Sequence, residues 1–403
     1  MADLSQLRIL EVIPSLSTGF GGPSEVAINL TRELRALGIN SEILTTDDDM
    51  PGVIDVPLGQ RVEYRQVPVY FFHRSSMRLK QFLFSADLTR WMWQNITNYN
   101  LVTGQTLFSY APDLAAIMCR FHQIPYGIRT IGQLTPWSLS QSRLRKEIYS
   151  NLLERSNLNH ATFIHCTSLQ EAQDVNNFGI KTPKVVIPLG VNPPSHILGA
   201  KQQLRQRFNI PADTPVILFM SRIHPKKRLD LLIQVLGELK SPQQPFHLII
   251  AGSGDARYVE SLHQLVTQHQ LQSQTTFAGF VTGEDKDLLL QGSDFFALPS
   301  YSENFGIALA EAMVVGIPVI TTPGVHISSD IAQAKAGIIV DNATELKIAI
   351  SQLLQSPQLR QELGDNGKRL AFSKYAWPAI ARSFADLYLL ILDEKSIPPI
   401  YFP

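Results

Sequence analysis

Residues 215–254 read PVILFMSRIHPKKRLDLLIQVLGELKSPQQPFHLIIAGSG and carry the clearest structural pattern in the chain. Pro215–Ser221 is an apolar run typical of a buried strand, Arg228–Leu239 has apolar residues at helical spacing, and Phe246–Ala251 is a second strand. The same alternation continues beyond this stretch. Five strands separated by four helices across Pro215–Thr322 predict a doubly wound α/β domain with a parallel sheet.

The N-terminal half repeats this pattern. A strand is predicted over Arg8–Ile13, a helix over Ser24–Leu37 and a second strand over Ser41–Thr45, and a glycine-rich loop joins the first strand to the helix. Two parallel strands with a helical crossover are typical of α/β folds. Residues 8–190 are therefore predicted to form a second α/β domain.

A proline-rich segment separates the two predicted domains. A polar, helix-like run lies between Asn192-Pro193-Pro194 and Pro211. Prolines on both sides of a polar segment are typical of an interdomain linker. A last, strongly apolar helix over Pro378–Leu392 has no strand after it, so we expect it to cover another part of the protein, such as the junction between the domains. The predicted boundaries are 1–191 for the N-terminal domain, 192–213 for the linker and 214–374 for the C-terminal domain.

Composition places the chain among globular proteins. Of 403 residues, 44% are hydrophobic and 17% are charged, which excludes an intrinsically disordered chain and fits about two domains. Lys plus Arg and Asp plus Glu both number 35, which argues against a generally basic nucleic-acid-binding protein. The two cysteines, Cys119 and Cys166, make neither a disulfide framework nor a zinc motif. Because no targeting signal and no apolar run of about 18 residues occurs, we expect a cytoplasmic protein without a transmembrane helix.

The net charge of the whole chain is zero, but one segment is strongly basic. Between Arg61 and Arg155 the sequence has twelve Lys and Arg residues and five Asp and Glu residues, and twelve minus five gives a net charge of about +7. Two interpretations stay open for this segment. It either binds an anionic or membrane-associated partner or forms a solvated basic surface.

Three loops carry residues suited to a phosphorylated ligand. The first, Gly19–Ser24, lies between a predicted strand and helix, where glycines allow close backbone approach and the helix N-terminus attracts an anion. The second, Ser221–Arg228, follows a strand end, and four of its eight residues are cationic, which suits a diphosphate. The alternative interpretations are a tight turn for the first loop and a solvated basic turn for the second.

The third loop, Pro299–Ala312, carries two glutamates at a strand-to-helix turn. Glu303 is predicted in the loop and Glu311 in the second turn of an otherwise apolar helix. Carboxylates accept paired hydrogen bonds from hydroxyls, so two of them can hold a sugar and a ribose, while the amides of residues 304–306 can bind phosphate. A carboxylate in an apolar helix needs a ligand or partner unless Glu311 faces solvent, which is the alternative.

Together these loops resemble the retaining nucleotide-sugar glycosyltransferases of the GT-B class, specifically family 4, also called glycosyl transferases group 1. The resemblance covers nearly the whole chain and implies two Rossmann-like domains facing each other across a cleft. It implies that the second domain holds most of the donor and that the helix within 375–403 returns to the first domain. The motifs that carry it are Glu303 and Glu311 with Asn304-Phe305-Gly306 between them, the pair Arg222 and Lys227, the run Val186–Val191, and Gly21-Gly22-Pro23.

The resemblance also implies roles for individual residues. Arg222 and Lys227 would neutralise the donor diphosphate, Glu303 would bind the sugar hydroxyls and Glu311 the ribose hydroxyls. Gly22 would give a backbone amide to the β-phosphate. Because the two cations would stabilise the leaving diphosphate, no metal is expected, and no cofactor beyond the nucleotide sugar as co-substrate. The implied catalytic residues are Arg222, Lys227 and Glu303, and the implied donor-binding residues are Gly21, Gly22, Phe280, Val281, Asn304, Phe305, Gly306 and Glu311.

The first domain departs from the family pattern. Where relatives carry histidines, the runs that begin at Thr103 and Thr130 have none, and Ile131 stands in place of an imidazole beside the reacting sugar. Isoleucine can neither donate a hydrogen bond nor transfer a proton. Either Gln105, Thr130 or Gln133 orients the acceptor, or the activity is reduced or lost.

The resemblance therefore leads us to expect a metal-independent hexosyltransferase of polysaccharide or glycoconjugate synthesis. It would move a hexose from a nucleoside-diphosphate sugar to a glycan or lipid-linked acceptor, in the cytoplasm or peripherally at the inner face of the membrane. No nucleic-acid partner is expected. The alternative is a donor-binding, catalytically weak GT-B protein that acts with a partner enzyme, and a nucleotide-sugar epimerase is a third interpretation.

Overall fold

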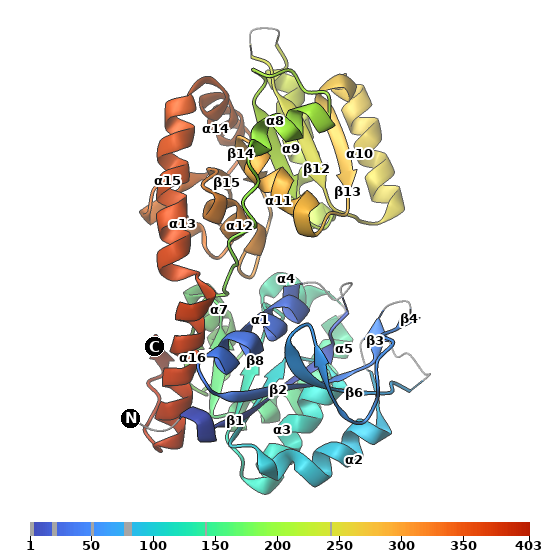
Figure 1. Ribbon diagram of the computed structural model, residues 1–403, viewed down its shortest axis with the longest axis vertical. Helices are drawn as coiled ribbons and strands as arrows, with labels where there is room; N and C mark the ends of the chain where they lie inside the picture. Colours follow the sequence, from blue (N-terminus) through green and yellow to red (C-terminus); the bar gives the residue numbers. More distant parts are fainter. Residues whose placement is uncertain (1–3, 18–21, 50–51, 76–82, 142, 242–243) are drawn as a thin grey trace. The chain divides into compact units, whose positions relative to one another are not determined.

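The computed structural model describes residues 4–17, 22–49, 52–75, 83–141, 143–241 and 244–403. The chain forms two compact units (Figure 1). The first unit comprises Met1–Gly190 and Trp377–Pro403, and the second comprises Val191–Ala376. Each unit is an α/β structure built on its own mainly parallel sheet.

The sheet of the first unit has the strand order β17-β10-β9-β8-β7-β1-β2-β6-β5 in the described part of the chain. Neighbouring strands are parallel except β5 and β6. The chain order reverses between β1 and β7, which is the switch point of a doubly wound fold. The strands are β1 (Arg8–Ser15), β2 (Asn40–Thr46), β5 (Arg61–Tyr64), β6 (Val67–Phe72), β7 (Leu101–Gln105), β8 (Tyr126–Arg129), β9 (Phe163–Cys166), β10 (Lys184–Val186) and β17 (Ile400–Tyr401).

Helices cover both faces of this sheet because its strands are apolar on both sides. On one face, Leu10 and Val12 of β1 pack in a core with α2 and α3, and on the other, Ile13 packs with Ile28 of α1. Helix α16 lies beside α1 (Figure 1). The helices are α1 (Gly22–Ala36), α2 (Ala86–Asn95), α3 (Tyr110–His122), α4 (Pro136–Ser140), α5 (Arg143–Tyr149), α6 (Arg155–His160), α7 (Leu169–Asn177) and α16 (Trp377–Leu392).

The second unit has the strand order β13-β12-β11-β14-β15-β16, and all its strand pairs are parallel. This is the order of a dinucleotide-binding fold, with its switch point between β11 and β14. The strands are β11 (Val216–Met220), β12 (His247–Ala251), β13 (Thr275–Gly279), β14 (Phe295–Leu298), β15 (Val319–Thr321) and β16 (Gly337–Ile339). The helices are α8 (Ala200–Arg207), α9 (Leu229–Leu239), α10 (Ala256–Gln268), α11 (Gly283–Gly292), α12 (Ile307–Val315), α13 (Ser328–Gln333), α14 (Ala343–Gln355) and α15 (Pro357–Lys374).

The segment 192–213 differs from its prediction as a linker. It contains helix α8 and belongs to the second unit. Leu204 of α8 is fully buried, and Arg205 donates to Asp294 at 2.7 Å. The polar composition that suggested a linker reflects the exposed side of a helix that packs on α11.

The final helix belongs to the first unit, as the resemblance implied. Trp377 begins α16 and lies over Gly190, where a Cβ atom would stand 2.1 Å from the indole ring. Phe384 contacts the ring of His165 from β9 edge to face, with centroids 4.9 Å apart. A side chain at position 190 would therefore separate the start of α16 from the first unit.

The acidic run Asp47-Asp48-Asp49 follows β2, and its first two residues do not form a solvated turn. Asp47 and Asp48 are buried. Asp47 Oδ2 lies 2.9 Å from His73 Nδ1, and Asp48 Oδ1 lies 3.1 Å from Arg74 Nε. Both carboxylates therefore have cationic or hydrogen-bonding partners from the chain itself.

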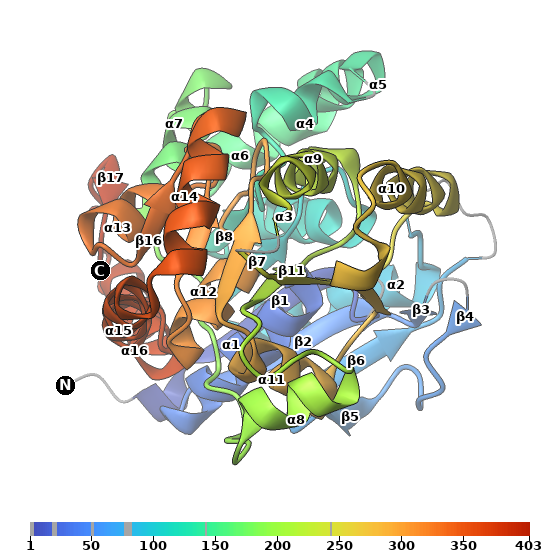
Figure 2. The same cartoon turned by 90° about the horizontal axis from the view of Figure 1, so that it is seen from above.

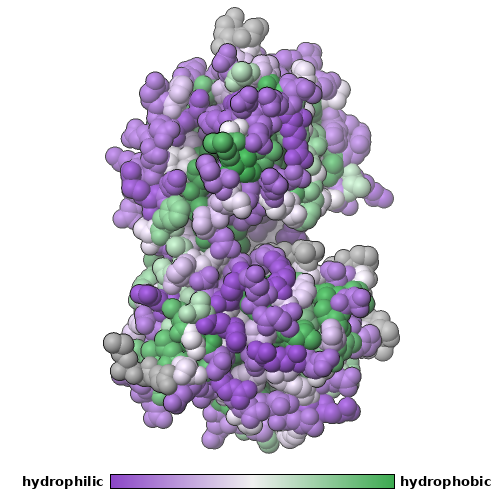
Figure 3. Space-filling model, viewed as in Figure 1, coloured by the Kyte–Doolittle hydropathy of each residue, from purple (hydrophilic) through white to green (hydrophobic). Residues whose placement is uncertain are grey.

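The face seen in Figure 3 is mostly hydrophilic, with separate apolar patches over each unit. Within the described ranges, no helix combines the length and the hydropathy that crossing a bilayer requires.

Candidate active site

The switch point of the second unit brings together two loops that the sequence singled out. One follows β11 and carries Arg222 and Lys227, and the other follows β14 and carries Glu303. Because β11 and β14 are neighbouring parallel strands, both loops leave the same edge of the sheet. In open α/β sheets this edge is where ligands bind.

The first loop is shaped by a capped 3₁₀ turn over Pro225–Lys227. His224 Nδ1 accepts a hydrogen bond from the Lys226 amide at 3.1 Å, and Arg228 ends the turn in the left-handed region with φ of 54°. Burial and the neighbouring cations lower the pKa of His224, so its imidazole is neutral at pH 7. The turn therefore gathers cations while its own histidine adds no charge.

Lys227 and Glu303 form an ion pair across the two loops. Both side chains are mostly buried. Ser300 Oγ donates to Glu303 Oε1 at 2.9 Å, and the Glu303 amide donates to the Gly324 carbonyl at 3.0 Å. Glu303 is thus fixed through both its backbone and its carboxylate, and Lys227 is held against it.

Backbone contacts join the two loops into one surface. The amide of Tyr301 donates to the Lys226 carbonyl at 2.9 Å, and Ser300 Oγ lies 3.1 Å from the same carbonyl oxygen. The Arg228 guanidinium lies 4.5 Å from the centre of the Tyr301 ring. These contacts fix the distance between the cationic turn and the glutamate loop before any ligand binds.

Helix α12 begins beside Glu303 with a glycine. Gly306 is its N-cap, has φ of 90° and offers no side chain to cap the helix. Phe305 is buried and packs edge to face on Tyr375, with centroids 5.3 Å apart, which anchors the turn. The predicted phosphate-binding segment Asn304–Gly306 therefore leads into a helix N-terminus without a side-chain cap, and such a terminus favours an anion.

Glu311 has a partner that sequence reasoning missed. Its Oε1 lies 2.6 Å from Lys286 Nζ of α11, and the Glu311 side chain is only 20% exposed. A carboxylate in an apolar helix needs a partner, and Lys286 of the same chain is the partner of Glu311. Nothing in one sequence shows that α11, which carries Lys286, packs against α12.

Two further predicted donor residues lie at the end of β13. Phe280 is 68% exposed and Val281 is partly buried, directly after this strand at the edge of the same sheet. Arg222 is exposed, and no carboxylate among the described residues forms an ion pair with it. An aromatic face and a cation are thus open to a ligand on this side of the second unit.

The predicted glycine-rich loop of the first unit is described only from its end. Gly21 lies outside the described residues. Gly22 is the first residue of α1 and is exposed, so its amide is among those without an intrahelical acceptor. This placement agrees with an anion-binding amide, and the assignment to the β-phosphate stays a prediction.

The predicted acceptor-side residues are engaged inside the first unit. Gln105 is buried and donates to Glu11 at 2.6 Å, and Thr130 is buried and donates to Glu171 at 2.6 Å. Gln133 accepts from the Leu107 amide at 2.5 Å. Gln105 and Thr130 therefore support the ends of β7 and β8, and their effect on an acceptor would be exerted through the position of these strand ends.

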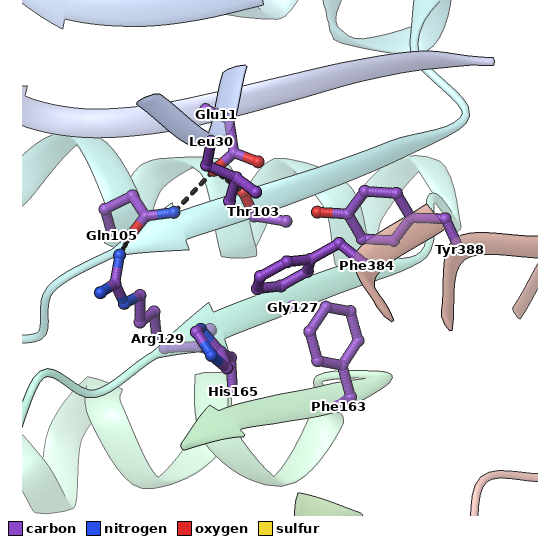
Figure 4. Close-up of a pocket in the computed structure, with 11 residues that line it drawn as sticks. Glu11, Leu30, Thr103, Gln105, Gly127, Arg129, Phe163, His165, Phe384 and Tyr388 are labelled. Carbon is purple, nitrogen blue, oxygen red and sulfur yellow. Dashed lines mark hydrogen bonds between the residues drawn. The ribbon is translucent and has the colours of Figure 1, made fainter. Parts of the chain in front are cut away.

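Gln105 belongs to a buried polar row that crosses the sheet under α16. Arg129 Nη1 donates to Gln105 Oε1 at 3.2 Å, and His165 Nε2 contacts the Ile187 carbonyl at 2.8 Å. Strand register places Gln105, Arg129 and His165 side by side. Figure 4 shows the Tyr388 hydroxyl directed towards this row, around a cavity of about 10 Å³ that has room for about one water molecule.

Burial sets the charge of this row. It raises the pKa of Glu11, lowers that of Arg129 to about 10 and lowers that of His165 to about 3, with Arg129 adding to the last effect. His165 is therefore a neutral, hydrogen-bonded interior side chain at pH 7.

A buried pair of carboxyl groups, Asp113 and Glu154, lies between α3 and the π-helical turn Ser150–Glu154. Asp113 Oδ2 accepts from the Tyr149 hydroxyl at 2.5 Å, and Glu154 accepts from the Phe108 amide. Desolvation raises the pKa of Asp113 to about 6, and desolvation with the nearby Asp113 charge raises the pKa of Glu154 well above its ordinary value. The pair therefore retains a proton that separate carboxyls would have lost near neutral pH.

This pair predicts a pH-dependent stability. The folded state holds protons on this pair more tightly than the unfolded state does. The contribution of the pair to the free energy of unfolding is therefore fully present at acid pH and falls as the pH rises through about 6 and above. Glu154→Gln keeps an acceptor for Phe108 and removes one charge. We expect its melting temperature to exceed that of the wild type by a few degrees at pH 8 and by little at pH 5.

Thermal unfolding of both proteins across this pH range is the measurement. The matched control is Glu147→Gln on the exposed side of α5, which should follow the wild type at every pH. Identical pH profiles for Glu154→Gln and the wild type would contradict the shared proton.

Two family models match the chain one after the other. The model of Glycosyltransferase Family 4 matches residues 20–194, and that of Glycosyl transferases group 1 matches residues 200–370. The chain belongs to glycosyltransferase family 4. The group 1 match contains the whole switch-point site of the second unit, from Arg222 to Glu311.

Curated relatives agree with this family. The chain is 29% identical over 197 residues to an uncharacterized glycosyltransferase of Methanocaldococcus jannaschii, across 48% of this chain and 49% of that relative, so the match spans about half of each protein. It is 24% identical over 390 residues to D-inositol 3-phosphate glycosyltransferase 2 of Catenulispora acidiphila, across 93% of this chain and 91% of the relative.

Solved structures share the fold. HepE of Anabaena, in complex with UDP-glucose, matches with a TM-score of 0.74 and 22% identity over 94% of this chain and 99% of HepE. The family 4 transferase therefore has a GT-B fold with two Rossmann-like units, and the predicted fold class is confirmed.

Proposed function

We propose that this family 4 protein is a retaining transferase that moves a hexose from a nucleoside-diphosphate sugar to a glycan or lipid-linked acceptor. The observation that carries the proposal is the Lys227–Glu303 pair, held at the switch point of the second unit beside the N-terminus of α12. A cation, a carboxylate and free helix amides at one place suit a ligand with both phosphates and hydroxyls.

The donor diphosphate would lie between the cationic turn and α12. Arg222 and Lys227 supply positive charge, and α12 begins at Ile307, shortly after Glu303, the ion-pair partner of Lys227. When a diphosphate arrives, Lys227 can share its charge between the phosphate and Glu303. The Glu303 carboxylate would then accept hydrogen bonds from sugar hydroxyls, and Glu311 would accept those of the ribose.

The chemical step breaks the bond between the anomeric carbon and the diphosphate oxygen. The acceptor hydroxyl oxygen forms the new bond, its proton leaves with the diphosphate or solvent, and retention is part of the proposal. Negative charge grows on the departing diphosphate, so preorganised cations stabilise the transition state more than the ground state. Arg222 and Lys227 are proposed to supply this charge without a metal.

The choice of donor starts from the solved relatives. HepE was solved with UDP-glucose, so UDP-hexoses are the first donors to test, followed by GDP- and ADP-hexoses. The exposed Phe280 and Val281 would contact the base. A peripheral membrane surface is also proposed as a partner, because the 61–155 segment carries a net charge of about +7.

Turnover of labelled nucleotide sugars tests the proposal. We expect release of nucleoside diphosphate from one donor and, with an acceptor, a product that has the donor's anomeric configuration by NMR. Nucleotide binding without hydrolysis or transfer would favour the second candidate, a catalytically weak donor-binding protein, which the absence of an imidazole at Ile131 favours. Appearance of an epimerised donor would instead indicate an epimerase.

Glu311→Ala should weaken binding of the nucleotide at least tenfold, about 1.4 kcal/mol, because a half-buried carboxylate facing the ribose is lost. Lys286→Met should weaken binding less, since it leaves that carboxylate in place. Calorimetric titration of the cognate nucleoside diphosphate is the measurement, and Glu362→Ala on the exposed side of α15 is the control. Affinity within a factor of about two of wild type for Glu311→Ala would refute the ribose assignment.

A further inference from the structure

The ion pair of Lys286 and Glu311 joins two helices of the second unit. Helices α11 and α12 lie side by side (Figure 2), and Lys286 Nζ of α11 lies 2.6 Å from Glu311 Oε1 of α12. The two side chains are 32% and 20% exposed, so solvent reaches both of them. The ion pair is therefore partly accessible to a ligand.

Lys286 pairs with a carboxylate of another helix, although three acidic residues lie beside it in sequence. These acidic neighbours are Glu284, Asp285 and Asp287. Side chains one or two residues apart on a helix do not face each other, and Asp285 forms its own ion pair with Arg207. The ammonium group of Lys286 is therefore held on the side of α11 that packs on α12, against Glu311.

The ion pair lies near the edge of the sheet at which ligands bind. Helices α11 and α12 follow β13 and β14, which belong to one parallel sheet, so both helices begin at the same edge. Lys286 is the fourth residue of α11 and Glu311 is the fifth residue of α12. At a rise of about 1.5 Å per residue, both residues lie within about 6 Å of the starts of their helices.

The ion pair has hydrogen-bonding capacity of both kinds left over. An ammonium group has three N–H donors and a carboxylate has two oxygen acceptors, and the contact between Lys286 and Glu311 uses one of each. Within the part of the chain that the structure describes, no second side-chain hydrogen bond or ion pair reaches Lys286 Nζ or Glu311 Oε2. Glu311 Oε2 is also accessible to solvent. A donor and an acceptor therefore stand side by side, open to a ligand.

We infer that Lys286 is a specificity-determining residue for the nucleotide, and that Lys286 and Glu311 together bind the two adjacent hydroxyls of its ribose. A hydroxyl is both a donor and an acceptor, so one hydroxyl donates to Glu311 Oε2 while the other accepts from the Lys286 ammonium. A deoxyribose leaves one of these charged groups without its hydrogen bond, and ribonucleotides are therefore preferred. The inference rests on the proposed function, because it names how the ribose of the same donor is recognised.

The test is calorimetric titration of the full chain with UDP, GDP and ADP, and then with the 2′-deoxy and 3′-deoxy forms of the nucleotide that binds. The wild type should bind the ribonucleotide at least about tenfold more tightly than either deoxy form. In Lys286→Met, the preference over one deoxy form should fall to about threefold or less, because the bond to the ammonium is gone. The preference over the other deoxy form should persist, because Glu311 remains.

Three further variants control this result. Lys286→Arg keeps a cation with several N–H donors and should keep both preferences. Lys286→Gln keeps N–H donors without the charge and should lower the same preference by a smaller factor than Lys286→Met. The matched control is Lys347→Met, since Lys347 pairs with Glu238 between two other helices of the same unit, and it should bind all three nucleotide forms like the wild type. Thermal unfolding of each variant separates loss of the fold from loss of the preference.

Three results would overturn the inference. Equal affinity of the wild type for the ribonucleotide and both deoxy forms would show that neither hydroxyl is bound. Unchanged preferences in Lys286→Met would assign both hydroxyls to Glu311 alone. Tighter binding of the ribonucleotide by Lys286→Met would make Lys286 a competitor for Glu311.

The proposed function and this inference fail in different ways. A preference for ribose that depends on Lys286, without any turnover of nucleotide sugars, would contradict the proposed transfer and leave the inference standing. Turnover with unchanged preferences in Lys286→Met would contradict the inference alone. Absence of binding for UDP, GDP and ADP would contradict both.

Discussion

Lys227→Ala is expected to lower kcat/KM for the nucleotide sugar by about a hundredfold, because removing one preorganised charge from a developing anion has costs of this order. The ammonium group is held by Glu303 at the switch point before the donor binds. It therefore needs little reorganisation during the reaction. Since the contact strengthens as the diphosphate departs, kcat should fall together with kcat/KM.

The control for this prediction is Lys347→Ala. Lys347 forms an exposed ion pair with Glu238 on the same unit, and such pairs contribute little to stability. Its rates should match the wild type. If Lys227→Ala raised KM alone and left kcat unchanged, Lys227 would be a residue for ground-state binding and not for the chemical step.

Gly252→Ala is expected to have the largest effect on stability, about 3 kcal/mol or more in the free energy of unfolding. Gly252 has φ of 141°, and a Cβ atom there would stand 1.9 Å from the Ser221 carbonyl oxygen. Ser221 directly precedes Arg222, so the methyl group would displace the loop that carries the cations. Gly252→Ala should therefore abolish donor binding as well as destabilise the fold.

Gly199→Ala separates the cost of backbone strain at a positive φ from the cost of the steric clash with Ser221. Gly199 also has a positive φ, of 68°, but a Cβ atom there meets nothing within 4 Å. It should cost about 1 kcal/mol from backbone strain alone. Denaturant unfolding of both variants is the measurement, and equal losses would show that the contact with Ser221 is unimportant.

Patterns local in sequence predicted the second unit well. The helix predicted over Arg228–Leu239 is α9, Leu229–Leu239, because its apolar residues recur at helical spacing. The strand predicted over Phe246–Ala251 is likewise β12, His247–Ala251. A strong periodicity of apolar residues, with helix- or strand-breaking residues at both ends, defines where an element begins and ends.

Contacts between elements were beyond reach of one sequence. The ion pair of Lys286 with Glu311 depends on how α11 packs on α12, and the burial of Asp47 depends on His73 from another strand end. The segment 192–213 was interpreted from its prolines and polar residues, although Leu204 buries α8 on the second unit. Composition reports solvent exposure on average, and tertiary packing decides each case.

Calorimetric titration of the full chain with UDP, GDP and ADP tests for a nucleoside-diphosphate site in the second unit. We expect one of them to bind to a single site, and we expect Lys227→Ala and Glu311→Ala each to weaken this binding at least tenfold while Lys347→Ala and Glu362→Ala leave it unchanged. Absence of binding for all three nucleotides, or unchanged affinity in Lys227→Ala and Glu311→Ala, would contradict it.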